Sequence, residues 1–459
     1  MKTANKKVTA ERLVKDALAK AKHFEEYHIF TFIDEKGALK RAREIDKKIA
    51  SGKNAGRLAG VPFVIKDNFM HPCGETTASA HILEGLSSPI TATAVEKLEA
   101  EGAIVIGRTN LDAFAHGSST ENSYYGPTSN AHDLKRVAGG SSGGSAVAVA
   151  LDIVEFATGT DTGGSIRQPA SFNGVYGLKP TYGCISRYGV VAMASSLDCV
   201  GFFTKTPEDM ELLMEITSGK DNKDLTTLDN YYVDSKALPV KKIGIVKEFD
   251  DESVDAEIRK ALKDKCEMLK NKGYEIIELE MPALKYALPA YYIIQPAEVA
   301  SNLSRYDGIR YGFRSEKAVD VDSIYKETRS EGFMPENKRR IMIGNFVLSS
   351  GFYDAYFLKA AKARTLIVEE YKKAFSKVDC ILMPVSPNPA FKIGEKTNDP
   401  VAMYMEDVMS VSLNLAGVPG LAIPAGETAD GLPIGLQLVG PRRADKTLIE
   451  FSKELQENE

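Results

Sequence analysis

The chain has 459 residues, of which 43% are hydrophobic and 26% are charged, so its composition is that of a globular protein with a large core. Its net charge of −5 argues against a broad nucleic-acid-binding face, because contacts to phosphates require clustered lysine and arginine. The five scattered cysteines lack Cys-x-x-Cys spacing, so they give no sign of a metal site and suit a reducing compartment. The N-terminus lacks the apolar segment of a secretion signal, and we therefore expect a cytoplasmic protein.

Helical and strand-like patterns alternate along the chain. Short apolar runs predict strands, and longer amphipathic runs predict helices. In chain order the predicted elements are helices at 9–26 and 35–50, a strand at 61–65, a helix at 92–101, a strand at 103–106, a helix after Ser145, strands at 154–157 and 242–246, a helix at 255–272, a strand at 274–279, a helix at 355–376, and strands at 381–385, 421–423 and 434–438. Such alternation predicts an α/β fold with a largely parallel sheet and helices on both faces.

Two other segments bear on the organisation of the chain. The polar region 218–239 predicts a surface loop. The longest uncharged stretch, 408–426, contains Asn414, Pro419 and Pro424, so it predicts a buried segment rather than a membrane span. The sequence contains no Gly-x-x-x-x-Gly-Lys-Ser/Thr loop, and it therefore gives no sign that this chain binds ATP in that way.

Two glycine-rich loops carry the strongest chemical signal. Residues 139–145 read GGSSGGS, with Ser141 as the first serine, and residues 159–167 read GTDTGGSIR, with Ser165 before the isoleucine. Glycine permits a close approach of the backbone, so two such loops can direct N–H groups and a hydroxyl at one point. Acyl transfer needs that combination of a nucleophile and oxyanion donors. The simpler interpretation is a pair of turns, which a lone Gly/Ser cluster would favour.

A serine nucleophile needs a base, and the sequence narrows the choice. None of the six histidines lies after His132, so the order Ser, Asp or Glu, His is impossible for Ser165. A Ser-x-x-Lys pattern at 323–326 lacks the motifs that accompany it in known enzymes, and we interpret it as chance. Lys66 is the better candidate, because it ends an apolar run, and burial there would lower its pKa toward neutrality. Taken alone, a surface lysine beside a turn would be the simpler interpretation.

Lys66, Ser141 and Ser165, together with the GLKPT run at 177–181, resemble the amidase signature family, whose signature core spans about 139–183 here. The resemblance implies a Ser-cisSer-Lys set in which Ser165 is the nucleophile, Ser141 follows a cis peptide bond and bridges, and Lys66 is the base. It also implies that Asp161 and Arg167 brace the loop rather than react. The implied oxyanion hole consists of the backbone N–H groups of Thr162, Gly163, Gly164 and Ser165.

Segments outside the signature extend the resemblance over nearly the whole chain. The runs at 182–198, 301–312, 338–365 and 403–426 are similar to the glutaminase subunits of the tRNA-dependent amidotransferases within this family. The resemblance implies that Arg340 binds the α-carboxylate of glutamine, Asp407 its α-amine, and Tyr291 the substrate side, with Tyr292 leaving the register open. The simpler interpretations are a solvated charge for Arg340 in its basic run and a solvated helix face for Asp407.

The resemblance also carries expectations about fold and partners. It implies a single amidase domain over 1–459, with a helical segment at about 1–55 and a large mixed central sheet covered by helices on both faces. Glutamine would be the substrate, and this chain would hold no metal or cofactor. ATP and Mg²⁺ would belong to a kinase/transamidase partner, the B subunit, which would also hold most of the tRNA. A small third partner, the C subunit, would clasp this chain. No membrane contact is expected.

Two other functions stay open from the sequence. A stand-alone amidase acting on other carboxamides would share Lys66, Ser141 and Ser165, so these residues do not discriminate. The segments around Arg340 and Asp407 favour the amidotransferase. A non-catalytic scaffold would be expected to have lost at least one catalytic residue, and all three are present. Whether the product is Gln-tRNA, Asn-tRNA or both depends on the partners and the tRNA supply.

Overall fold

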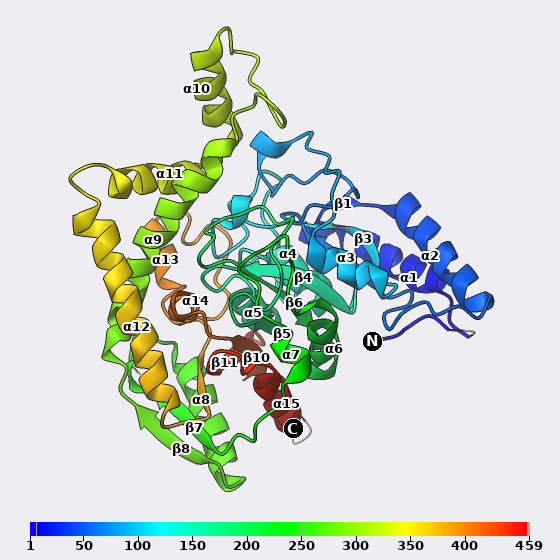
Figure 1. Cartoon of the computed structure of the whole chain (residues 1–459). Helices are drawn as coiled ribbons and strands as arrows, with labels where there is room; N and C mark the ends of the chain where they lie inside the picture. Colours follow the sequence, from blue (N-terminus) through cyan, green and yellow to red (C-terminus); the bar gives the residue numbers. More distant parts are fainter. Residues whose placement is uncertain (6, 250, 457–459) are drawn as a thin grey trace.

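The computed structural model describes residues 1–5, 7–249 and 251–456. Within these residues, one large sheet forms the centre of the molecule (Figure 1). Its eleven described strands are β1 (Phe30–Ile33), β2 (Pro62–Lys66), β3 (Ile104–Thr109), β4 (Phe156–Asp161), β5 (Tyr176–Lys179), β6 (Cys199–Thr204), β7 (Lys242–Val246), β8 (Glu275–Leu279), β9 (Cys380–Pro384), β10 (Gly420–Glu427) and β11 (Pro433–Val439).

Helices surround this sheet and connect many of its strands. The α-helices in the described part of the chain are α1 (Ala10–His23), α2 (Glu35–Ala50), α3 (Thr93–Ala100), α4 (Gly143–Ala150), α5 (Arg167–Asn173), α6 (Pro207–Thr217), α7 (Tyr231–Asp234), α8 (Ala256–Asn271), α9 (Ala287–Asn302), α10 (Val321–Gly332), α11 (Pro335–Leu348), α12 (Lys359–Phe375), α13 (Pro400–Met405), α14 (Val411–Ala416) and α15 (Asp445–Gln456). None of the helices within these described ranges is long and apolar enough to cross a membrane.

The sheet combines parallel and antiparallel strands. Its order is β1-β3-β2-β4-β6-β5-β10-β11-β9-β7-β8. β2 runs parallel to β3 and β4, and β7 runs parallel to β8 and β9. The six other neighbouring pairs among the described strands are antiparallel, so the prediction of a largely parallel sheet is wrong, whereas a mixed sheet is confirmed. For the β10–β11 pair the reason is connection length, because residues 428–432 alone join the two strands, too few for a parallel crossover. The other antiparallel pairs join strands that are further apart in the sequence.

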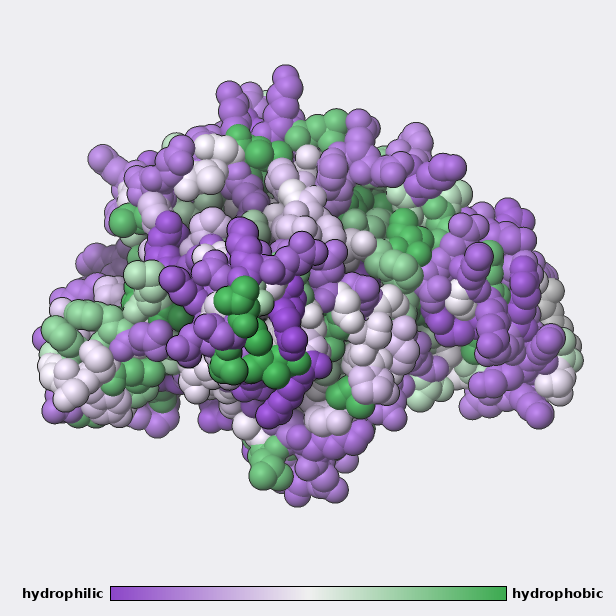
Figure 2. All heavy atoms as spheres, turned by 90° about the horizontal axis from the view of Figure 1, so that it is seen from above, coloured by the Kyte–Doolittle hydropathy of each residue, from purple (hydrophilic) through white to green (hydrophobic). Residues whose placement is uncertain are grey.

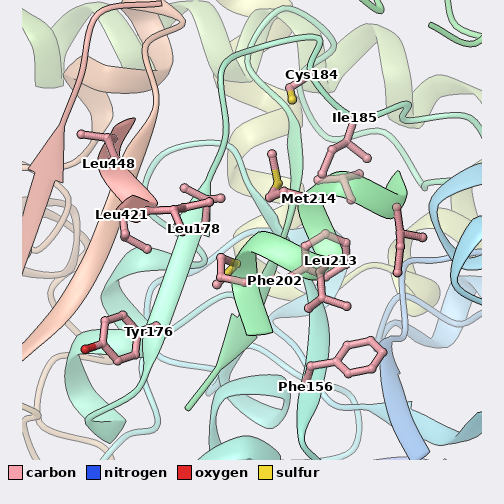
Figure 3. Packing of buried hydrophobic residues seen from close by; sticks show 14 of the residues in the cluster. Phe156, Tyr176, Leu178, Cys184, Ile185, Phe202, Leu213, Met214, Leu421 and Leu448 are labelled. Carbon is pink, nitrogen blue, oxygen red and sulfur yellow. The ribbon is translucent and has the colours of Figure 1, made fainter. Parts of the chain in front are cut away.

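Alternate residues of the central strands face two separate hydrophobic clusters. In β2, Phe63 and Ile65 belong to one cluster and Val64 to the other. Side chains of α3, α6 and α15 complete the first cluster, and side chains of α1, α4 and α5 complete the second. Figure 3 shows part of the first cluster, including Phe156 of β4 and Phe202 of β6. Because both faces are buried, the strands read as continuous apolar runs, and helices on both faces are confirmed.

A group of later helices packs at one end of the sheet, and it carries part of the site described below. Side chains of α9, α12 and α14 share a hydrophobic cluster with β7 and β9, while α10 projects away from the body (Figure 1). A Cβ on Gly344 of α11 would overlap the carbonyl of Pro296 in α9, so the two helices cross with their backbones in contact. This crossing brings Arg340, one turn before Gly344, beside Gln295 of α9.

The predicted elements correspond to observed ones, with small shifts at their ends. Helix α2 has the predicted bounds, and its N-cap Asp34 accepts a hydrogen bond from the Gly37 N–H at 3.0 Å. Residues 409–423 of the uncharged stretch 408–426 are buried around α14 and the start of β10, which agrees with the predicted buried segment. The region 218–239 is more than a surface loop, because Tyr232 of α7 is buried. The face seen in Figure 2 is mostly hydrophilic, with hydrophobic atoms in separate groups.

Candidate active site

Lys66 lies at the carboxyl end of the buried strand β2 and is itself completely buried. Its Nζ donates hydrogen bonds to Ser141 Oγ at 2.8 Å, to Ser142 Oγ at 2.8 Å and to Thr160 Oγ1 at 2.9 Å. Strands β2 and β4 are neighbours, so the end of β2 delivers the lysine beside Thr160 of β4. A surface lysine is therefore the wrong interpretation of Lys66.

Burial changes the protonation of this lysine. It lowers the pKa of Lys66 to about 7, although the carboxylates of Asp112, Asp161 and Asp198 act in the opposite direction. All hydroxyl partners of its Nζ are neutral, and no carboxylate forms an ion pair with it among the described residues. A substantial fraction of Lys66 is thus neutral near pH 7 and can accept a proton.

The hydroxyl groups around Lys66 show where that proton can come from. Ser142 Oγ donates to the Thr160 carbonyl at 3.2 Å, so it accepts from Lys66. Thr160 Oγ1 also accepts from the Asn68 amide at 3.1 Å. Ser141 Oγ has no hydrogen-bond partner other than Lys66 within the described chain, so its proton is free to move onto a neutral Nζ. The arrangement therefore pairs Lys66 with Ser141.

Ser165 lies between β4 and α5 and is 8% exposed. Its carbonyl accepts from the Ser142 N–H at 3.2 Å, and the Gly140 N–H donates to Gln168 Oε1 at 3.1 Å, so the two glycine-rich loops are in contact. The Gly140–Ser141 peptide bond is cis. Ser165 Oγ makes no hydrogen bond to a described residue, so its hydroxyl is available for a reaction.

The loop that carries Ser165 is held by a buried ion pair. Arg167 Nη2 and Nε donate to the two carboxylate oxygens of Asp161, each at 3.0 Å, and both residues are fully buried. Burial raises the pKa of Asp161, but Arg167 and the other donors outweigh it and lower the pKa to about 2. The same carboxylate accepts from the N–H groups of Gly164 at 2.9 Å and Ile166 at 3.1 Å. Asp161 thus fixes the backbone around the serine.

This bond bears on the expected oxyanion hole, which stays a prediction. The Gly164 N–H donates to Asp161, so it is not a free donor in this conformation, and the remaining candidate donors are the N–H groups of Thr162, Gly163 and Ser165. The Thr162 hydroxyl donates to Asp198 at 2.7 Å, and the Gly163 carbonyl accepts from the Ser410 hydroxyl. These contacts orient the backbone on both sides of the loop.

Arg340 is buried, with 3% of its surface exposed, so the solvated charge is the wrong interpretation. Its Nε donates to Glu336 Oε1 at 2.8 Å, and its Nη1 donates to Gln295 Oε1 at 3.1 Å. The guanidinium lies over the rings of Tyr292 and Tyr404, at 5.2 and 5.5 Å from their centres. Its Nη2 has no hydrogen-bond partner among the described residues, which leaves one face of the fork free for an anion.

Asp407 belongs to the same cluster and is also buried. Its carboxylate accepts from the Ser118 hydroxyl at 2.9 Å and from the Tyr292 hydroxyl at 2.7 Å. Burial raises the pKa of Asp407 to about 6, although the two hydroxyl donors and Arg340 oppose the shift. At pH 7 the group is mostly ionised and can bind a cation. Tyr292 therefore connects the arginine to the aspartate.

The neighbouring tyrosine reaches the catalytic loop. A Cβ added at Gly163 would lie 2.6 Å from the Tyr291 hydroxyl, so this side chain packs directly on the proposed oxyanion loop and requires glycine there. Tyr291 and Tyr292 hold their rings at 88° to each other on α9. The sequence leaves open which of the two tyrosines faces the substrate. In the structure Tyr291 contacts Gly163, and Tyr292 contacts Arg340 and Asp407.

A cavity of about 240 Å³ lies beside Arg340. Asp112, Ser118 and Ser119 form one wall, and a Cβ on Gly140 would lie 2.6 Å from the Ser119 backbone nitrogen. Arg340 lines the cavity as well. The cavity is therefore adjacent to the segment that carries Ser141, and a small amphoteric molecule would meet cationic and anionic groups there.

Several residues of this arrangement lie beyond what sequence reasoning identified. Ser142 stands beside Ser141 in the same motif, so the motif itself could have indicated it. Thr160 lies within the 159–167 motif, which could likewise have indicated it. The others sit on separate elements outside the two glycine-rich motifs; they are Asp198, Ser118, Gln295, Glu336 and Ser410. No group of three or more His, Cys, Asp or Glu side chains within the described residues is placed to hold a metal ion.

The buried lysine, the paired serine loops and the mixed sheet are matched by a known family. The amidase family model matches residues 12–449, and the chain belongs to this family. It is 52% identical over 426 residues to the A subunit of the glutamyl-tRNA(Gln) amidotransferase of Carboxydothermus hydrogenoformans, covering 92% of this chain and 87% of that protein. It is 50% identical over 444 residues to the same protein of Thermoanaerobacter pseudethanolicus, covering 95% and 90%.

Solved structures give the same picture for the fold. The crystal structure of the A subunit of the glutamyl-tRNA(Gln) amidotransferase from Thermotoga maritima is 38% identical, with a TM-score of 0.78 over 96% of this chain and 90% of that one. A crystal structure described as an amidase is 30% identical, with a TM-score of 0.84 over 98% and 96%. The amidase signature fold is therefore confirmed, and similarity reaches both an amidase and a tRNA-dependent enzyme.

Proposed function

We propose that this chain is the glutamine amidohydrolase subunit of a tRNA-dependent amidotransferase and works through an acyl-enzyme on Ser165. The observation that carries the proposal is the cluster in which Lys66 bonds Ser141 beside the Ser165 loop, in a chain half identical to the A subunits of such enzymes. Amidase family membership supports amide hydrolysis as the chemistry.

In the proposed reaction, neutral Lys66 takes a proton from Ser141, which takes the proton of Ser165. Ser165 Oγ then forms a bond to the side-chain carbonyl carbon of glutamine. The negative oxygen of the tetrahedral intermediate accepts hydrogen bonds from donors among the N–H groups of Thr162, Gly163 and Ser165. The C–N bond breaks as the relay returns a proton to the nitrogen, and ammonia leaves. Water then hydrolyses the glutamyl ester and restores the Ser165 hydroxyl.

We assign the binding of the α-carboxylate and α-ammonium groups of glutamine to the cluster that contains Arg340 and Asp407. The free Nη2 of Arg340 suits the α-carboxylate, because a guanidinium offers a fixed fork to a carboxylate. Asp407 suits the α-ammonium, and its two hydroxyl donors stabilise the ionised form. Tyr291 would contact the substrate beside Gly163. This set demands a free amino acid, whereas a simple amide would leave both charged groups unpaired.

We further propose that the ammonia is consumed in a complex in the cytoplasm. A kinase/transamidase partner, the B subunit, would bind ATP, Mg²⁺ and most of the tRNA, and would amidate Glu-tRNA(Gln), Asp-tRNA(Asn) or both. The small C subunit would clasp this chain. The net charge of −5 supports this division, because a chain with an acidic balance is poorly suited to hold tRNA alone.

The test uses the complex purified from native cells through this chain. With Ser165→Ala in the complex, amidation of Glu-tRNA or Asp-tRNA should fail with glutamine and persist with ammonium, because only ammonia production needs the nucleophile. Ser171→Ala, a buried serine on α5 outside the site, serves as the matched control and should behave as wild type. Amidase neighbours keep a stand-alone amidase as the rival. Purification without a partner, with aliphatic amides turned over faster than glutamine, would establish that rival.

A further inference from the structure

His116 lines the cavity beside Arg340 and is completely buried, yet the site described so far does not use it. Its Nδ1 is paired with the side-chain amide of Asn337 on α11, whereas its Nε2 has no hydrogen-bond partner among the described residues. A buried polar nitrogen without a partner is uncommon, because its desolvation is not offset. This atom therefore calls for an explanation.

The hydrogen-bond pattern fixes the tautomer of this imidazole. The Asn337 amide nitrogen donates to the Ala113 carbonyl at 2.8 Å, and because a carbonyl only accepts, the atom facing it is the NH₂ group. The same NH₂ group faces His116 Nδ1, so Nδ1 accepts and the ring proton resides on Nε2. Burial and the nearby Arg340 cation lower the pKa of His116 well below its usual value, which keeps the ring neutral. Nε2–H is consequently a fixed donor without an acceptor.

A second unpaired donor lies at the same cavity. Arg340 uses Nε for Glu336 and Nη1 for Gln295, and its Nη2 has no partner within the described chain. His116 and Arg340 both line the cavity, and each carries one donor without a partner among the described residues. A carboxylate can accept from both donors and also matches the positive charge of Arg340, whereas an ammonium group has no acceptor.

We propose that His116 is a specificity-determining residue whose Nε2–H donates to the substrate α-carboxylate alongside Arg340. This inference rests on the proposed function, since it assigns a second donor to the carboxylate of glutamine. The neutral donor adds a directed hydrogen bond without adding charge, so it selects a carboxylate by geometry where Arg340 selects it by charge. Asn337 is then a positioning residue, because it sets the tautomer.

The test measures ligand affinity by calorimetry, with the full-length chain and whatever partners co-purify, in a Ser165→Ala background that prevents turnover. His116→Met should weaken binding of L-glutamine about tenfold, as expected for loss of a hydrogen bond to a charged group. It should change binding of 4-aminobutanamide, which lacks only the carboxylate, by less than about twofold. His116→Gln retains a donor and an acceptor and should restore most of the affinity.

The matched control is His71, a buried histidine whose Nδ1 accepts from the Cys73 N–H and whose Nε2 is paired with Glu99. His71→Met should leave both affinities unchanged. Equal losses for the two ligands in His116→Met, or no loss for glutamine, would overturn the role of His116 while leaving the proposed function intact. Failure of the parent protein to bind glutamine would overturn the proposed function and this inference together.

A second readout concerns the ring itself. Nitrogen-15 NMR of histidine-labelled protein, assigned through His116→Gln, should show the Nε2–H tautomer of His116, and its Nε2 resonance should shift when L-glutamine is added. A proton on Nδ1, or a resonance that glutamine leaves in place, would overturn the proposal even if the affinities change.

Discussion

The proposed catalytic cluster (Lys66, Ser141 and Ser165) and the proposed binding cluster (Arg340 and Asp407) both contain a buried cation, but burial affects the charges of Lys66 and Arg340 differently. Lys66 has only hydroxyl and carbonyl partners, so burial lowers its pKa to about 7 and yields a neutral base. Arg340 has Glu336 at 2.8 Å, so it keeps its charge when buried. A buried cation with only neutral hydrogen-bond partners can lose its proton and act as a base, whereas one paired with a carboxylate keeps its charge and can bind an anion.

The two clusters also differ in how the chain assembles them. The catalytic cluster comes from the end of β2 and from two glycine-rich loops within the first part of the chain. The binding cluster needs α9, α11 and the segment before α14, which meet through a helix crossing and a tyrosine pair. The proposed catalytic residues are therefore encoded in local motifs, whereas the proposed binding residues come together through packing between distant elements.

The largest expected effect separates two buried lysines. Lys66→Met should lower kcat for glutamine hydrolysis about 10³-fold, because the relay loses its base. Lys179 is equally buried and its pKa is also lowered, but its Nζ donates to the Pro180 carbonyl and contacts no catalytic serine. Lys179→Met should keep kcat near wild type in protein that remains folded by circular dichroism. Similar losses in both variants would mean that burial of any lysine, not its place beside Ser141, sustains the activity.

The next effect concerns the binding cluster. Arg340→Ala should lower kcat/KM for glutamine about 100-fold, or roughly 3 kcal/mol, because Glu336 and the substrate carboxylate lose their partner. The loss should be small for 4-aminobutanamide. Arg339→Ala removes the neighbouring arginine, which also pairs with Glu336 but has 44% of its side chain exposed, and should have little effect on either substrate. Equal losses on both substrates for Arg340→Ala would remove this residue from the carboxylate site.

The pH dependence should resolve the two clusters. Below pH 7 kcat should fall about tenfold per pH unit, because Lys66 with its pKa of about 7 becomes protonated and cannot accept the serine proton. Below pH 6 the KM for glutamine should also rise, because Asp407 with its pKa of about 6 becomes neutral and no longer attracts the ammonium. Asp407→Asn should abolish the second effect and keep the first. A kcat that is flat from pH 5 to 9, with chemistry rate-limiting, would contradict a neutral lysine base.

The smallest effect sharpens the role of one hydroxyl. The Tyr292 hydroxyl lowers the pKa of Asp407, so Tyr292→Phe should move the rise in KM to higher pH and raise KM at pH 7 a few-fold, about the value of one hydrogen bond. Tyr404 stacks on Tyr292 but donates its hydroxyl hydrogen bond to Glu336, so Tyr404→Phe should not change the pH at which KM rises. If KM rises at the same pH in Tyr292→Phe as in the wild type, the Tyr292 hydroxyl does not influence the pKa of Asp407.

Much of the sheet could be predicted because its strands are buried on both faces and read as apolar runs, as β2 and β7 do. β5 and β6 carry glycine and lie among turns, so their runs lack a clear boundary. β1 is a short edge strand with two exposed positions, which removes the pattern altogether. The antiparallel centre follows from pairing between distant strands, which no local pattern encodes.

The candidate site, too, could be predicted from the sequence only where its residues lie in local motifs. Ser141 and Ser165 stand out because they lie in glycine-rich motifs, and Lys66 stands out because it ends an apolar run. Gly164 illustrates what a motif leaves out: its N–H belongs to Asp161, and only the folded loop reveals this. His116 carries no signal in sequence at all, since its free nitrogen depends on Asn337 more than two hundred residues later.

The central claim is that Ser165 forms the covalent intermediate with glutamine. A diazoketone analogue of glutamine, incubated with the wild-type protein and its partners and followed by peptide mass spectrometry, tests it directly. The account predicts one label on the peptide that contains Ser165, lost in Ser165→Ala and slowed in Lys66→Met. A label on Cys184 or another cysteine, or labelling that survives Ser165→Ala, would contradict it.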